Sequence, residues 1–177
     1  MPSAPHPSPL WRFWLFLLLC SGIIWLGGVN VRAIIGNELL KPGTLEFEEF
    51  LSPEAEREIF RLLSLTSLLI IGSYCVLFIS SILFLVSSPY GMKEHGWLLM
   101  SAILFYVFVP VEAFTMYLDG KMIYLEFFTT VDNEVFRELF VRRMGALKGA
   151  PVVALLCYYT IVGLVVFQPF RKKQEAA

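Results

Sequence analysis

The chain has 177 residues, of which 57% are hydrophobic and only 16% charged, and its net charge is −1. Soluble domains usually carry about a quarter charged residues, so this composition is typical of a membrane protein. A balanced charge without a Lys/Arg-rich run excludes a protein that binds nucleic acid through a basic surface.

The chain begins with a polar lead and a first apolar segment. Residues 1–10 contain four prolines, and we expect them to be disordered. Phe13–Val31 carries no charge and is long enough to cross a hydrocarbon core of about 30 Å as a helix. It is also longer than the apolar part of a cleaved signal peptide, which is about 7–15 residues. We expect an uncleaved span over residues 13–31, within a single domain of residues 11–177.

A long helix is predicted next. Ser52 suits an N-cap and Pro53 the first helical position, and no further proline follows until after Val86. Glu54, Glu56 and Glu58 make the first turns of this helix acidic, which favours an extramembrane helix over residues 53–63. The apolar remainder, residues 64–86, is the second predicted span.

The second half of the chain repeats this plan. A short polar link leads to a third predicted span over residues 97–118, and Asp119-Gly120 predicts a turn. Residues 133–144 show an apolar stripe at helical spacing and predict a second extramembrane helix. Glycines and a proline then break the helix before a fourth predicted span over residues 152–169.

Two stretches indicate an internal repeat. Leu45–Phe60 and Leu125–Phe140 align without a gap, with seven of sixteen positions identical. Each lies between two apolar segments, although a match of this quality can also arise by chance. We interpret the chain as an all-α integral membrane four-helix bundle. It would consist of two transmembrane hairpin-like halves, each with an amphipathic helix in its long connection.

Sidedness is predicted from the basic residues. Four spans place both termini on the same side of the membrane. The short segments on that side carry the higher density of Lys and Arg, whereas the two long connections carry the larger number. Density favours cytoplasmic termini in a plasma (inner) membrane.

Small residues are candidates for helix packing. Thr66, Ser73 and Ser80 recur every seven residues in the second span, as do Ser21 and Gly28 in the first. Small residues let helix backbones approach one another within lipid. The pattern fits packing within one chain, and also a seam for a second subunit.

Glu112 is the acidic residue within a predicted span, two positions after Pro110. A carboxylate at membrane depth is costly and indicates a proton relay or an ion contact, unless it is neutralised structurally. The candidates for pairing with it are Arg32, Tyr117, Arg142, Arg143, Lys148 and Tyr158.

Known catalytic and cofactor motifs do not occur. The two histidines, His6 and His95, lie outside the predicted spans, so haem ligation by two histidines within the bundle is excluded. The three cysteines lie in apolar segments, where small buried side chains are the expected role. We predict no metal and no cofactor, and an enzyme has the least support.

The repeated pattern E-x-x-R-E-h-F is a candidate docking surface. We expect Arg57, Phe60, Arg137 and Phe140 to anchor it to the bilayer surface or to a neighbouring protein. The leading expectation is a non-catalytic accessory or assembly subunit of a larger membrane complex, or a chain that associates with itself. The alternative is a small oligomeric transporter or channel in which Glu112 contacts the permeating ion or proton.

Overall fold

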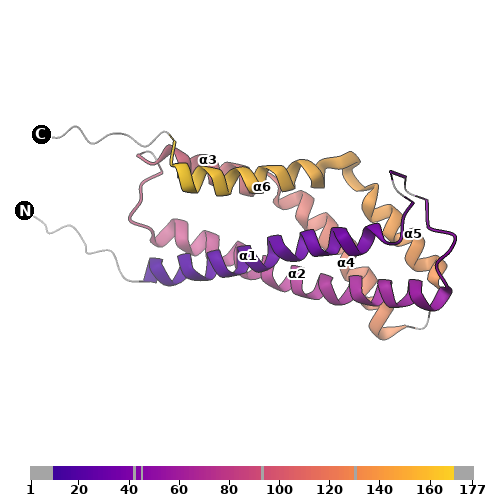
Figure 1. Ribbon diagram of the computed structural model, residues 1–177. Coiled ribbons are helices and arrows are strands. Elements are labelled where there is room, and N and C mark those ends of the chain that lie inside the picture. Colours follow the sequence, from indigo (N-terminus) through magenta and orange to yellow (C-terminus); the bar gives the residue numbers. More distant parts are fainter. Residues whose placement is uncertain (1–9, 42, 45, 93, 130, 170–177) are drawn as a thin grey trace, which may run out of the picture. The chain divides into compact units, whose positions relative to one another are not determined.

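The computed structural model describes residues 10–41, 43–44, 46–92, 94–129 and 131–169, and this part of the chain is helical (Figure 1). Its helices are α1 (Leu10–Asn37), α2 (Pro53–Ser87), α3 (Gly96–Val107), α4 (Val109–Phe128), α5 (Asn133–Met144), the short 3₁₀ helix η1 (Ala146–Gly149) and α6 (Ala150–Phe167). The expected disordered lead lies almost wholly outside the described residues.

Four helical stretches are long and apolar enough to cross a membrane. They are Leu10–Asn37, Pro53–Ser87, Gly96–Phe128 and Asn133–Phe167. Four such stretches indicate a multi-pass membrane protein, in agreement with the four apolar segments found in the sequence.

The second stretch is one continuous helix, as predicted. α2 has 35 residues and begins at Pro53. Its start is capped by Ser52, whose hydroxyl accepts a hydrogen bond from the Ala55 amide at 3.2 Å. A capped start and a proline in the first turn explain why the helix begins at this point.

The third stretch differs from the prediction. α3 ends at Val107 and α4 begins at Val109, so the helix is interrupted just before Pro110, which has no amide hydrogen to donate. α4 then continues to Phe128, ten residues beyond the predicted end of the span. The turn predicted at Asp119-Gly120 is therefore wrong. Tertiary packing overrides the local preference, because Leu118 and Met122 are fully buried on either side.

The fourth stretch breaks where its glycines predicted. α5 covers Asn133–Met144, and α6 begins at Ala150. Between them, Leu147, Lys148 and Gly149 all have positive φ angles, of 57°, 47° and 89°. The backbone cannot continue as an α-helix through left-handed residues, so α5 and α6 are separate elements.

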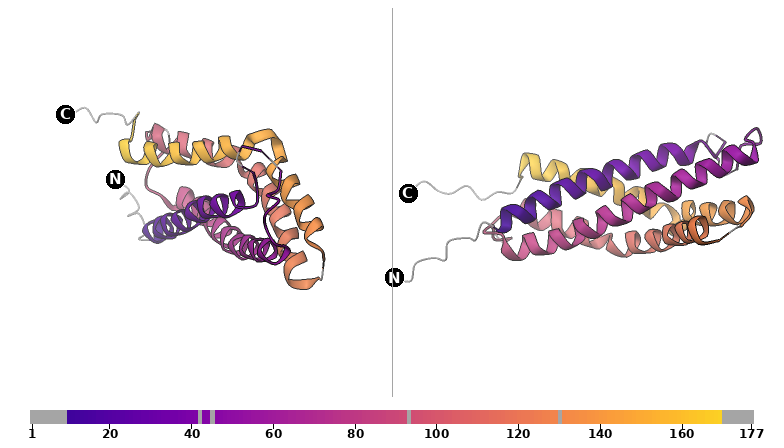
Figure 2. Two further views of the ribbon diagram at one scale, coloured as in Figure 1. Left: turned by 45° about the vertical axis from the view of Figure 1, so that its right-hand side comes forward. Right: turned by 90° about the horizontal axis from the view of Figure 1, so that it is seen from below.

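The chain divides into two compact units. The first contains residues up to Ser87 together with Met116–Met144, and the second contains Ser88–Thr115 together with the chain from Gly145 onward. In the first unit α1 and α2 run antiparallel, side by side along most of their length (Figures 1 and 2). In the second unit α3 and α6 pack against each other.

α2 contributes a regular buried seam. Its buried residues include a series that alternates steps of three and four, namely Phe60, Leu63, Ser67, Ile70, Tyr74, Leu77, Ser81 and Phe84. This spacing is that of the contact positions in a two-helix coiled coil. Of the small residues singled out in the sequence, Ser80 is buried beside this seam, whereas Thr66 and Ser73 are only half-buried.

α1 contributes small and aromatic residues to the same contact. The ring of Trp25 lies 5.3 Å from that of Tyr74, centroid to centroid. A Cβ atom added to Gly28 would come within 3.0 Å of Ile70 Cγ1. Glycine at this position therefore allows the two helices to approach closely.

The core of the first unit lies beyond the α1–α2 seam. It contains Leu39, Leu40, Phe60, Leu63, Met122, Phe136 and Phe140. The rings of Phe60 and Phe136 stack with their centroids 5.3 Å apart. These residues come from α2, α4, α5 and the segment after α1, so one apolar cluster joins all of them.

We predict that Gly28→Val destabilises the protein and that Gly27→Val, its neighbour, does so much less. Both substitutions carry the same helix propensity, but Gly27 has no atom within 4 Å of an added Cβ. Overpacking at Gly28 should cost about 1–3 kcal/mol. The measurement is the midpoint of thermal unfolding in detergent, and equal shifts for the two variants would contradict the close α1–α2 contact.

Candidate functional site

Glu112 lies in the first turn of α4, directly after the interruption that follows α3. Its side chain is half-buried, and its carboxylate accepts a hydrogen bond from the Tyr158 hydroxyl of α6 at 3.1 Å. Tyr158 is 5% exposed and packs against the rings of Phe105 and Phe108. The carboxylate is thus held by a buried phenol within the second unit.

The other residues considered as partners of Glu112 occupy different places. Arg32 and Arg143 both bind Asp119. Tyr117 is 56% exposed, and the ammonium of Lys121 lies 4.6 Å from the centre of its ring. Arg142 lines a surface hollow on the first unit, and Lys148 lies in the left-handed break before α6. Of the six residues, the structure brings Tyr158 to Glu112.

Asp119 forms a buried ionic centre that the sequence analysis missed. Its carboxylate is bound by both terminal nitrogens of Arg32 from α1, with a distance of 2.6 Å between Arg32 Nη2 and Asp119 Oδ1. Arg143 from α5 adds a hydrogen bond from Nε to Oδ1 at 2.7 Å. Asp119 is 1% exposed and Arg32 is 4% exposed. We call Arg32, Asp119 and Arg143 the Asp119 centre.

The Asp119 centre contains two guanidinium groups and one carboxylate, so it carries one positive charge in excess. Bidentate pairing of Arg with a carboxylate is among the strongest ionic contacts in proteins. Removing the carboxylate would leave Arg32 buried without a counter-ion, which is far more costly than losing a surface pair. The centre therefore joins α1 to α4 and α5, which lie far from it in the sequence.

Asp119 was missed because Asp-Gly is a common turn sequence. A contrary signal was present in its neighbours. Apolar residues Leu118, Met122 and Leu125 continue at helical spacing past Asp119, as expected for a helix that does not end there. The partner Arg32 follows the first charge-free segment directly, which is a natural position for a charge at a membrane boundary.

A second set of ionic contacts joins the two copies of the repeated pattern. Glu56, which is 2% exposed, accepts a hydrogen bond from Arg137 Nη2 at 2.8 Å and another from Asn133 Nδ2 at 3.1 Å. Arg57 pairs with Glu126 at 3.1 Å. In this way α2 carries charges that hold α4 and α5.

These contacts change the interpretation of the docking candidates. Phe60 and Phe140 are 0% and 2% exposed and lie in the core of the first unit, which corrects their expected role as anchors to the bilayer or to a neighbour. Arg57 lies over the ring of Phe136, and Arg137 lies over that of Phe47. The repeated pattern therefore packs the chain against itself, because the amphipathic helices turn their apolar sides inward.

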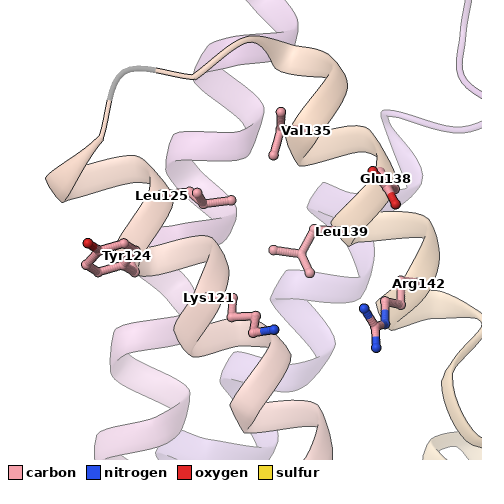
Figure 3. A pocket seen from close by; sticks show the side chains of 7 residues that line it. All are labelled: Lys121, Tyr124, Leu125, Val135, Glu138, Leu139 and Arg142. Atoms are coloured by element: carbon pink, nitrogen blue, oxygen red, sulfur yellow. The ribbon is translucent and has the colours of Figure 1, made fainter.

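A surface hollow of about 360 Å³ lies between α4 and α5. Its lining consists of Lys121, Tyr124, Leu125, Val135, Glu138, Leu139 and Arg142 (Figure 3). Three apolar side chains lie between the helices, and Lys121 and Arg142 extend toward each other at one end. All seven residues belong to the first unit, so the hollow is a feature of that unit alone.

Exposed aromatic side chains mark the end of α4. Phe128 is 73% exposed and Tyr124 is 58% exposed, and their rings stack at a centroid distance of 5.6 Å. Phe127 is 47% exposed. We call Tyr124, Phe127 and Phe128 the α4 aromatic patch.

Comparison with known proteins gives no relative for this chain: no family model matches it, and no curated protein or solved structure does so either. Within the described residues, no group of three or more His, Cys, Asp or Glu side chains is placed to hold a metal ion.

We predict that Asp119→Ala lowers the free energy of unfolding by about 3–5 kcal/mol, since it leaves Arg32 buried and unpaired. The matched control is Glu49→Ala, because Glu49 pairs with Lys41 at the surface with 77% of its side chain exposed. The control should cost at most about 1 kcal/mol. Thermal unfolding in detergent measures both, and a mild effect of Asp119→Ala would show that the centre contributes little to stability.

Proposed function

We propose that the chain is a non-catalytic integral membrane subunit that binds another membrane protein through the α4 aromatic patch. This function requires a particular placement of the chain in the membrane. The four apolar helical stretches cross the bilayer as a four-helix bundle, and the helix ends on the side of the two long connections project from it.

The depth of α1 in the bilayer is inferred from the positions of its charged residues. Arg12 and Arg32 flank the charge-free segment of α1, and the twenty helical steps from one to the other rise about 30 Å. This equals the thickness of a hydrocarbon core. The Asp119 centre, which contains Arg32, would then lie at one boundary of the hydrocarbon.

The exposure of the α4 aromatic patch is the observation that carries the proposal, because the patch would lie outside that boundary. Phe128 follows Asp119 by nine residues, about 13 Å along the helix. The headgroup layer on each side is only about 5–8 Å thick, so Phe128 would extend beyond it into water. A cluster of exposed aromatic residues in water is typical of a protein interaction site.

The interior polar groups also support a structural role. The carboxylate of Asp119 binds two arginines, and that of Glu56 binds Arg137 and Asn133. These contacts satisfy charges that a catalytic site would keep available for a substrate. They hold the helices that present the aromatic patch.

We expect a stoichiometric membrane-protein partner to co-migrate with the chain after mild detergent extraction from native membranes. Phe128→Ala should reduce the bound partner strongly, because aromatic anchors contribute much of the energy of interfaces. Phe16→Ala is the matched control, since Phe16 is 61% exposed within the charge-free part of α1. Native mass determination reads out both variants. A wild-type chain that runs alone would overturn the proposal.

A transporter or channel is the second candidate, and the setting of Glu112 favours it. An interrupted helix with a carboxylate at the start of its second part is a feature of membrane transport proteins. Glu112 lies seven residues before Asp119, about 10 Å deeper along α4 if Asp119 marks the boundary. Its contact with Tyr158 would set the orientation of the carboxylate.

If this second function is correct, Glu112→Gln should abolish proton or cation flux in liposomes containing the purified chain. The amide keeps the size of the side chain and can still accept a hydrogen bond from Tyr158, but it carries no charge. Glu49→Gln serves as the control at an exposed position. Equal flux in the wild type and Glu112→Gln would remove the residue on which this candidate depends.

A further inference from the structure

We propose that the hollow between α4 and α5 binds the phosphate group of an anionic phospholipid through Lys121 and Arg142. This inference rests on the membrane insertion proposed above, but not on the binding of a protein partner. The site consists of two cationic side chains from different helices at one end of an apolar depression (Figure 3).

Lys121 and Arg142 differ from most other basic residues of the described helices in their ionic contacts. Arg32, Arg57, Arg61, Arg137 and Arg143 each pair with a carboxylate. In the part of the chain that the structure describes, Lys121 and Arg142 form no such pair, although Glu138 shares the lining of the hollow. Two cations that converge without a carboxylate between them favour an external anion.

The depth of the two cations matches that of lipid phosphates. Lys121 follows Asp119 by two residues, and Arg142 precedes Arg143, which binds Asp119. If the Asp119 centre lies at the hydrocarbon boundary, both cations lie just outside it, in the headgroup layer. Long basic side chains at this level reach lipid phosphates readily.

The shape of the surface favours a lipid over a soluble anion. Tyr117 lies one turn of α4 from Lys121 on the side of the Asp119 centre, and it is 56% exposed. Its ring would lie beside the acyl chain of a lipid whose phosphate is held at Lys121. The apolar residues Leu125, Val135 and Leu139 line the rest of the hollow, and an apolar surface beside the cations strengthens their attraction for a negative charge.

The net charge favours an anionic over a zwitterionic headgroup. Lys121, Arg142 and Glu138 together carry one positive charge in excess. The nearby Asp119 centre carries another, since two arginines share one carboxylate there. A choline group would bring a cation into this positive field, whereas a glycerol headgroup would not.

The test uses the full-length chain in nanodiscs made from phosphatidylglycerol and phosphatidylcholine in equal amounts. Native mass spectrometry after release measures which lipid stays bound. We expect the wild type to retain phosphatidylglycerol preferentially. Lys121→Gln/Arg142→Gln should weaken this retention about 25-fold, because each basic residue near an anionic lipid contributes roughly a factor of five.

The matched control is Lys41→Gln/Arg61→Gln, which removes the same charge from residues that are paired with carboxylates. This control should keep the preference for phosphatidylglycerol. An equal loss in both double variants would assign the effect to the overall charge and overturn the site. Unchanged retention in Lys121→Gln/Arg142→Gln would also overturn it.

Two further arms separate the possible failures. Inorganic phosphate at millimolar concentration should not displace the lipid, and displacement would identify a site for a soluble anion instead. Co-migration of a protein partner is measured on the same samples. If Lys121→Gln/Arg142→Gln loses the lipid but keeps the partner, the lipid site is supported independently of the partner. If the wild type has no partner but still selects phosphatidylglycerol, only the proposed subunit role is contradicted.

Discussion

The ionic contact between Asp119 and two arginines is the constraint on which the first unit depends. A buried carboxylate is strongly unfavourable unless cations balance its charge. Arg32 reaches it from α1 and Arg143 from α5, so the need to balance the charge of the buried carboxylate holds three helices together. The apolar core that contains Met122 meets this centre, because Arg32 Nη2 lies 3.9 Å from the Met122 sulfur. Polar and apolar contacts therefore specify the same arrangement.

The packing of α2 against α1 depends on a different physical requirement. Its buried residues recur at steps of three and four, and the glycines of α1 leave room for the larger side chains. Close packing between helices needs small residues on one side, because lipid provides no hydrophobic force that drives helices together. The seam at Gly28 and Ile70 meets this need. The ionic centre and the seam together account for the pairing of α1 with α2.

The two copies of the repeated pattern meet each other in the folded chain. Asn133 donates a hydrogen bond to the carbonyl of Pro53, its counterpart in the first copy, at 2.9 Å. Phe60 and Phe140, also counterparts, have ring centroids 6.4 Å apart. Two copies related by a two-fold axis would bring equivalent positions into contact in this way. The beginnings of the copies differ, since Phe47 lies in a loop and Phe127 in α4. Duplication therefore stays an interpretation of the sequence.

The sequence by itself determined the helical class, the four apolar stretches, the start of α2 at Pro53 and the break between α5 and α6. These features follow from local properties: length, hydropathy, capping and the conformations open to glycine and proline. Tertiary structure alone decided the length of α4, the burial of Phe60 and the ionic partners of Asp119. Their physical cause is contact between residues far apart in the chain. The preference of Asp-Gly for a turn is weak compared with a carboxylate held by two arginines, and no local pattern reveals that those arginines are near.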